Sequence, residues 1–136
     1  MKDYKNIHSF SEGLAAVESK HKWGFINKEG EEAIPCKYWQ VYDFCEGLAS
    51  VELDNKYGCI DKTGKEVIPF KYDFISSFKE GLALVELNNK MGFINTKGEE
   101  VVQLIYNKVY DFKEDLAVVI SLEGEFCVIN RNGKRL

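Results

Sequence analysis

The stretch FSEGLAAVESKHKWGFINKEG at residues 10–30 decides the fold, because the chain repeats it. FCEGLASVELDNKYGCIDKTG follows at residues 44–64, and FKEGLALVELNNKMGFINTKG at residues 78–98. A fourth, degenerate copy begins at Phe112, so the four leading phenylalanines are spaced by 34 residues. A fixed period of this length is typical of stacked or radially arranged units.

Each copy predicts short strands joined by tight turns. GLAAVE and KWGFIN have the alternating or β-rich pattern of strands, and the pairs Asp54-Asn55 and Asn88-Asn89 suit two-residue hairpins with positive φ. A turn closed by glycine follows, then a third strand such as EEAIP, which Pro35 ends or places on a sheet edge. We therefore predict an all-β fold in which each repeat is a three-stranded antiparallel meander, followed by a short connection.

Two sets of small residues recur at fixed positions of the repeat. Ala15, Val17 and Ile26 have apolar equivalents in every copy and predict the core. Gly24 and its equivalents Gly58 and Gly92 lie inside a strand, where glycine normally weakens pairing. We expect these glycines to leave room for the backbone or an aromatic ring of a neighbouring unit.

The two ends of the chain carry complementary parts of one repeat. We divide a single domain, residues 1–136, into units 10–43, 44–77, 78–111 and 112–136, the last completed by residues 1–9. Counting from Phe112 through Leu136 and on to Phe10 gives 34 positions, the length of one repeat. This count favours a closed propeller-like ring or barrel-like array, with an open β-solenoid as the alternative.

The linked motifs E-G-L-A, K-W-G, D/N-x-x-G and I-P-x-K-Y resemble the WG repeat, or KWG repeat, of bacterial proteins. The resemblance covers nearly the whole chain, although the Trp-Gly pair is intact only at Trp23-Gly24. It implies a β-repeat interaction module of bacterial source, without a catalytic motif to transfer. It also implies that the Trp-Gly residues belong to the scaffold.

Composition argues against several classes of partner. The chain is 45% hydrophobic and 29% charged, with a net charge of −4 and no cluster of basic residues, so we expect no nucleic-acid binding. We see no signal sequence and no stretch of transmembrane length, so we expect no membrane insertion and a cytoplasmic location. Cys36, Cys45, Cys59 and Cys127 have no regular spacing, and we expect reduced thiols that act as small hydrophobic residues.

No catalytic, cofactor or metal motif appears in the sequence, and we expect a protein that is not an enzyme. Glutamates recur at equivalent positions in the copies, and we interpret them as partners of backbone N–H groups or as solvated residues of strand faces. A Cys-His dyad and a carboxylate-based activity are the catalytic alternatives that remain open. The recurring glutamates are Glu12, Glu46, Glu80 and Glu114 in one set, and Glu18, Glu52 and Glu86 in another.

Candidate binding residues are aromatic side chains whose equivalents in sister copies are polar. Trp39 corresponds to Lys5, Asp73 and Asn107, and Phe74 to Asn6, Gln40 and Lys108, while Tyr42 and Tyr110 correspond to His8 and Ser76. Because exposed aromatic residues commonly anchor partners, we predict a non-catalytic module that binds protein or peptide through these four residues. Binding of carbohydrate or cell-envelope glycan is the alternative function. A purely structural explanation of these aromatic residues is that each ring packs against a neighbouring unit.

Overall fold

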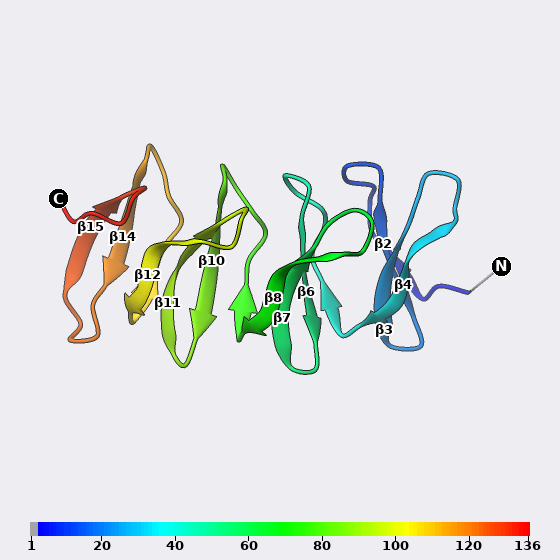
Figure 1. The fold of residues 1–136 in the computed structure, drawn as a ribbon, viewed down its shortest axis with the longest axis horizontal. Coiled ribbons are helices and arrows are strands. Elements are labelled where there is room, and N and C mark those ends of the chain that lie inside the picture. The colour runs from blue at the N-terminus through cyan, green and yellow to red at the C-terminus, as the bar shows by residue number, and fades with distance from the viewer. Residues whose placement is uncertain (1–2) are drawn as a thin grey trace.

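The computed structural model describes residues 3–136, which form an open row of four antiparallel β-sheets (Figure 1). The sheets follow one another in chain order along the long axis, and the two ends of the chain lie at opposite ends of the row. No helix occurs in the described part of the chain, which confirms the all-β prediction.

Within each sheet, the strands lie side by side in chain order. The first sheet contains β1 (Asn6–Ile7), β2 (Ala15–Ser19), β3 (Lys22–Ile26) and β4 (Glu32–Tyr38). The second contains β5 (Gln40–Val41), β6 (Ala49–Leu53), β7 (Lys56–Ile60) and β8 (Glu66–Tyr72). The third contains β9 (Phe74–Ile75), β10 (Leu82–Leu87), β11 (Lys90–Asn95) and β12 (Glu100–Tyr106). The fourth contains β13 (Lys108–Val109), β14 (Leu116–Ile120) and β15 (Phe126–Asn130).

The prediction of three-stranded units is one strand short for the first three sheets, because the expected connection is itself a strand. In the second sheet, Val41 of β5 pairs with Val51 of β6, and the Trp39 N–H donates to the Glu52 carbonyl at 2.9 Å. Val41 is buried, so an extended tail both satisfies its backbone and contributes to the core. The sheet therefore begins in the tail that the sequence assigned to the preceding repeat.

The same local pairing explains why the structure shows no ring. Ile7 of β1 pairs with Val17 of β2, so the N-terminal segment completes the first sheet rather than the last. This segment behaves like β5, β9 and β13, each of which pairs with the next strand along the chain, as short connections favour. Residues 3–136 contain no closed sheet, and their four sheets form an open row, so the structure does not confirm the predicted ring.

Tight turns with positive φ join the strands, as predicted. Asp54 and Asn55 have φ values of 53° and 66°, and Asn88 and Asn89 have nearly the same values. A second turn of this kind precedes the long strands, where Gly13 has a φ of 86° and its degenerate equivalent Asp115 has 67°. Aspartate is among the few residues other than glycine that adopt this region readily, which explains the substitution in the fourth copy.

The core lies between successive sheets. Phe25 of the first sheet meets Phe44 of the second with ring centroids 4.8 Å apart, and Phe93 of the third meets Phe112 of the fourth at 4.9 Å. The predicted core is confirmed, because the recurring alanine, valine and isoleucine are buried in all four copies. These residues are Ala15, Ala49, Ala83, Ala117, Val17, Val51, Val85, Val119, Ile26, Ile60, Ile94 and Ile129.

The strand glycines make room for their own sheet, which corrects the expectation of a neighbouring unit. A Cβ on Gly24 would lie 2.4 Å from the carbonyl oxygen of Ile34, and one on Gly92 would lie 2.4 Å from that of Val102. Both contacts come from the fourth strand, whose register shifts opposite the glycine. Because β4 is the sheet edge, it also accommodates Pro35 in mid-strand.

Candidate functional site

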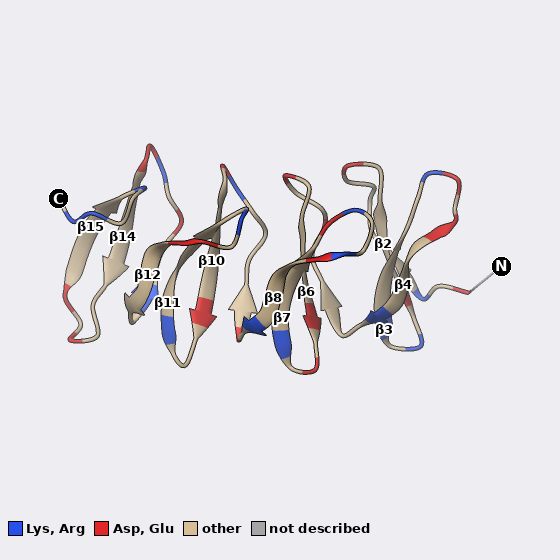
Figure 2. Cartoon of the chain, in the orientation of Figure 1, with Lys and Arg blue, Asp and Glu red and all other residues tan. Residues whose placement is uncertain are grey.

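The two-residue hairpins and the bends that precede the short strands line one long edge of the row, at the bottom of Figure 1. We call this the hairpin edge and define it by residues 20–22, 39, 54–56, 73, 88–90 and 107. Figure 2 shows that most charged residues lie along the two long edges, and that the middles of the long strands carry few. The hairpin edge is therefore polar overall, which makes a large aromatic residue on it conspicuous.

Trp39 is that aromatic residue, and 51% of its surface is exposed. It lies at the bend between β4 and β5, and the Lys22 Nζ of the preceding sheet is 5.8 Å from its ring centroid. At the equivalent bend, Lys56 donates to Asp73 Oδ1 at 2.6 Å. Each of these two bends thus contacts the lysine of the preceding sheet, while the residue at the bend differs between copies.

The structure brings Tyr42 and Phe74 together, but it does not expose them as expected. Both are half-buried, and their ring centroids are 6.1 Å apart. Tyr57 joins them, with its centroid 5.4 Å from Phe74 and 6.5 Å from Tyr42. Phe74 therefore packs across the boundary between the second and third sheets, as the structural explanation of these aromatics required.

Sequence reasoning missed Tyr57 because it occupies the tryptophan position of the Trp-Gly pair, which was assigned to the scaffold. Trp23 makes the equivalent contact with His8 at 4.8 Å, and Tyr57 differs from it by the added contact with Phe74. Burial, and then the charge of Glu52, raise the pKa of Tyr57 to about 12. The three rings thus form an apolar, neutral patch that is partly buried by packing and partly exposed.

Tyr110 is exposed but lies apart from the other three candidates. It follows β13 in the last sheet, with Lys108 Nζ 5.6 Å from its ring centroid. It lines a surface depression with Leu116, Val118, Phe126 and Val128, which face away from the rest of the row. The four predicted residues consequently do not form one continuous patch.

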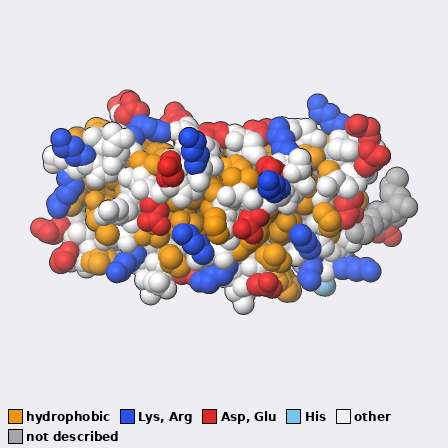
Figure 3. Space-filling view, viewed as in Figure 1, with side chains coloured by type: hydrophobic (Ala, Val, Ile, Leu, Met, Phe, Trp, Pro, Cys, Tyr) orange, Lys and Arg blue, Asp and Glu red, His pale blue; other side chains and the backbone are white. Residues whose placement is uncertain are grey.

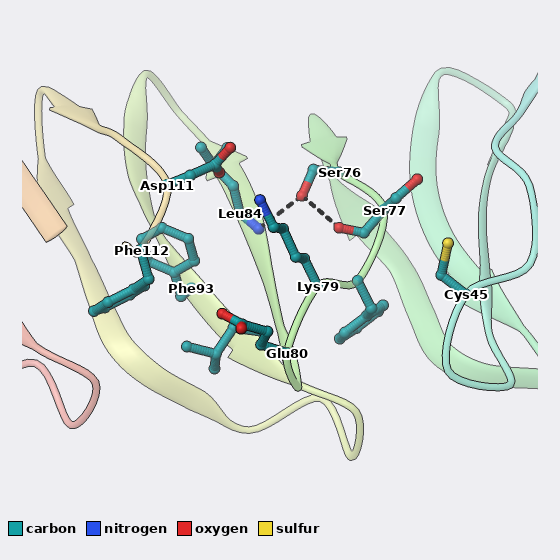
Figure 4. A pocket seen from close by; sticks show the side chains of 11 residues that line it. Cys45, Ser76, Ser77, Lys79, Glu80, Leu84, Phe93, Asp111 and Phe112 are labelled. Carbon is teal, nitrogen blue, oxygen red and sulfur yellow. Dashed lines mark hydrogen bonds between the residues drawn. The ribbon is translucent and has the colours of Figure 1, made fainter. Parts of the chain in front are cut away.

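A cavity of about 440 Å³ lies between the second, third and fourth sheets (Figure 4). Ser76, Ser77 and Lys79 approach it from the connection after β9, and Asp111 faces it from the connection after β13. The Ser76 hydroxyl accepts the Leu84 N–H at 2.9 Å and donates to the Ser77 carbonyl at 3.1 Å. The serine hydroxyl is thus bonded within its own turn. The cavity is lined by one lysine, one aspartate and several phenylalanine rings.

The cavity was not predicted because its lining comes from three copies of the repeat. Cys45 belongs to the second copy, Lys79 and Asp111 to the third, and Phe112 to the fourth. The recurring tail motif, Y-x-x-V-x-D-F, was the available signal, since it supplies Asp111 and Phe112. The sequence does not indicate the distance in space between the tail segments of two adjacent copies.

Two of the four thiols have surroundings that raise their pKa. Burial raises the pKa of Cys45, as do Glu12, Asp43 and Glu46 around it, and burial raises that of Cys59 to about 11. A thiol with a raised pKa remains protonated at neutral pH and is a poor nucleophile. Within residues 3–136, no three His, Cys, Asp or Glu side chains are grouped so that they could hold a metal ion.

Two of the recurring glutamates hold successive sheets to one another. Glu12 Oε1 accepts the Gly47 N–H at 2.9 Å, and Glu46 Oε1 accepts the Gly81 N–H at 2.9 Å. Each bond reaches from one tight turn to the equivalent turn of the next sheet. For these two glutamates, the interpretation as partners of backbone N–H groups is confirmed.

These features define a tandem-repeat β protein with a recurring scaffold and variable edges. The WG containing repeat matches residues 2–22, 23–57, 57–90 and 91–120, and the chain belongs to this family. No curated protein matches the chain. Among residues 3–136, no helix has the length and apolar character needed to span a membrane.

Three solved structures share the fold at low identity. The computationally designed Ika8 protein is 13% identical with a TM-score of 0.59, over 99% of this chain and 50% of that one. KlHsv2 of Kluyveromyces lactis, with loop 6CD replaced by a Gly-Ser linker, is 11% identical with a TM-score of 0.62, over 100% and 52%. The designed Ika4 protein is 10% identical with a TM-score of 0.51, over 96% and 92%. The chain thus spans about half the length of the first two structures.

Proposed function

We propose that this protein is a non-catalytic binding module for a protein or peptide, and that Trp39 anchors the partner. The exposed indole of Trp39 is the observation that carries the proposal. The equivalent residues Lys5, Asp73 and Asn107 are polar, so the repeat itself does not require an aromatic ring at this bend. A half-exposed tryptophan on a fixed backbone is a typical anchor of a binding surface.

The surroundings of Trp39 favour a peptide over a flat apolar partner. Lys22 lies beside it, Lys20 and His21 belong to the same hairpin as Lys22, and the Asp54-Asn55 turn forms the next hairpin. An aromatic anchor with charged and amide groups around it suits a segment that combines one apolar side chain with acidic neighbours. The bend is held by the bond between the Trp39 N–H and the Glu52 carbonyl, which limits the ordering needed on binding.

The proposal that the module is non-catalytic is supported by the structural contacts of several carboxylates and thiols. Glu12 and Glu46 bind backbone N–H groups between sheets, and the thiol of Cys45 has a raised pKa. These contacts give two of the recurring glutamates a structural role and keep the Cys45 thiol protonated, which supports a binding function over catalysis.

Selection from a random peptide library tests the proposal, because it makes no assumption about the sequence of the partner. The displayed library is panned on the wild-type protein, and enriched peptides are titrated against Trp39→Ala. Ile105→Ala is the matched control, because Ile105 is 50% exposed but lies in the β12 edge strand, away from the bend. A Trp23→Tyr background, which copies the residue of the second repeat, leaves Trp39 as the only tryptophan and lets its fluorescence report binding.

We expect enriched peptides that shift Trp39 emission and lose most of their affinity in Trp39→Ala but not in Ile105→Ala. Peptides that bind both variants equally, or the absence of any enriched peptide, would overturn the proposal. The same variants applied to a glycan array test the alternative, since retention of glycans that depends on Trp39 would replace the peptide with a carbohydrate ligand.

A further inference from the structure

The N-terminal end of the row exposes two apolar side chains that the repeat buries elsewhere. Ile7 is 58% exposed and Phe10 is 49% exposed, whereas their equivalents in the second sheet, Val41 and Phe44, are buried. The equivalents in the third and fourth sheets are buried in the same way. Inside the row, these positions pack against the front face of the preceding sheet, by which we mean the face turned toward the next sheet along the chain.

The C-terminal end exposes the front face itself. In the fourth sheet, Leu116, Val118 and Val128 are each about 40% exposed, and Phe126 is 75% exposed. In the first sheet, the equivalents of the first three are Leu14, Ala16 and Phe25, which are buried against the second sheet. The fourth sheet therefore presents an apolar surface that has the composition of an interior interface.

The two ends are the two halves of one interface that the chain already makes three times. Between the first and second sheets, Phe25 of the front face meets Phe44 of the next sheet, and between the third and fourth sheets Phe93 meets Phe112. At the ends, Val128 stands at the position of Phe25, and Phe10 at that of Phe44. We propose that a second copy of this chain docks its Ile7–Phe10 end onto the Leu116, Val118 and Val128 face of the first, continuing the row head to tail.

The polar contact between sheets also has both of its partners at the ends. Within the row, Glu12 and Glu46 accept the N–H of Gly47 and Gly81 in the next sheet. Glu114, the equivalent of Glu12, is exposed on the last sheet, and Gly13, the equivalent of Gly47, is on the first. In the head-to-tail pair, the Glu114 carboxylate of one copy accepts the Gly13 N–H of the other.

The outer edge of β15 fits the same arrangement. Arg135 and Leu136 begin to pair with this strand, through an Ile129–Arg135 bridge and a bond from the Leu136 N–H to the Val128 carbonyl at 3.0 Å. In the first sheet, Tyr38 pairs with Trp23 further along the equivalent edge. Tyr4 stands at the position of Tyr38, and Phe126 at that of Trp23, so Tyr4 of the second copy comes to lie beside Phe126 of the first.

A contact between two different surfaces repeats, and it closes into a ring only if the rotation between copies allows it. Two copies provide eight sheets, and this chain spans about half of the single chains of Ika8 and KlHsv2. We therefore expect a closed pair that contains two identical contacts. A pair that uses the same face twice is excluded by this proposal, because each contact needs one N-terminal end and one C-terminal face.

The test combines light scattering with variants at each end. Wild type is expected to have twice the chain mass of 15.6 kDa at micromolar concentration. Ile7→Glu and Val118→Glu should each be monomeric when alone, because a buried charge is placed in both contacts of the pair. Mixed together, they should recover a pair with one intact contact, formed by the C-terminal face of the first variant and the N-terminal end of the second.

The matched control is Val67→Glu, which changes a residue 40% exposed in β8, away from both ends, and should leave the pair intact. Circular dichroism of each variant verifies that its strands are retained. A monomeric wild type at high concentration would overturn the proposal. So would a mixture that stays monomeric, or an Ile7→Glu variant that still forms the pair, since the latter indicates contact between two C-terminal faces.

Discussion

The first and fourth sheets are built from copies of one repeat, yet equivalent positions are buried in the first sheet and exposed in the fourth. The first sheet has four strands and buries its front face, whereas the fourth has three strands among the described residues and exposes the equivalent face. Figure 3 shows hydrophobic side chains at the surface along the row, between charged groups at its edges. The comparison teaches that burial in this fold is a property of the neighbouring sheet as much as of the residue, as expected for stacked repeats.

The largest difference is expected between the two phenylalanines that open the first and second copies. Phe44→Ala removes a ring that is 1% exposed and packs on Phe25, and it should lower the free energy of unfolding by roughly 4 kcal/mol. Phe10→Ala removes a half-exposed ring and should cost about 1 kcal/mol in the monomer. Urea unfolding at concentrations where the chain is monomeric measures both; equal losses would contradict the comparison.

A second difference concerns the strand glycine and its replacement in the last copy. Gly92→Cys, which copies Cys127, places a Cβ against the Val102 and Gln103 backbone and should cost roughly 3 kcal/mol. The reverse change, Cys127→Gly, should cost about 1 kcal/mol, because β15 lacks a full fourth strand at that point. Thermal melting compares the two, and a mild effect of Gly92→Cys would show that β12 is able to move away.

The glutamates that link sheets should differ in the same direction. Glu46→Ala removes the acceptor of the Gly81 N–H and should cost about 1 kcal/mol in the monomer. Glu114→Ala should leave the monomer unchanged, but it should weaken the head-to-tail pair. Unfolding and light scattering on the same two variants separate these effects, and a monomer equally destabilised by both would refute this assignment.

The smallest effect should appear at alkaline pH, where Tyr57 and its equivalent Phe126 differ by a hydroxyl group. The pKa of Tyr57 is raised from its ordinary 10.0 to about 12 in the folded protein. The folded state therefore holds its proton more tightly than the unfolded state, so its contribution to stability is complete below pH 10 and is lost as the pH rises toward 12. Tyr57→Phe should flatten this part of the stability profile relative to wild type. An unchanged profile would contradict the burial of Tyr57.

Periodicity and turn chemistry predicted the all-β class, the core positions and the turns, because these depend on residues close in the sequence. The number of strands per sheet was misjudged because of the stretch YWQVYDF. It contains two buried aromatic residues and the short strand β5, and its sequence resembles a loop because it lacks the alternating pattern of a longer strand. The count of 34 positions favoured a ring, but it does not distinguish completion within the first sheet from completion of the last, and residues 3–136 contain no closed sheet.

The candidate site was predictable in part. Trp39 stands out by comparison of copies, since its sisters are polar and its bend is exposed. Tyr42 and Phe74 meet the same criterion, but they pack with Tyr57, and that contact depends on the distance between two sheets. The cavity beside Lys79 and Asp111 depends on the same kind of distance, which no local pattern encodes.

The head-to-tail continuation of the repeat interface is tested most directly by a cross-link between its two halves. A double variant, Phe10→Cys with Val128→Cys, places thiols at the positions equivalent to Phe44 and Phe25, whose rings are 4.8 Å apart. After treatment with a short reagent that carries two maleimide groups, each of which alkylates one thiol, mass spectrometry should find position 10 of one copy linked to position 128 of another. Links between two copies of position 10 or of position 128, or no link between copies at all, would contradict it.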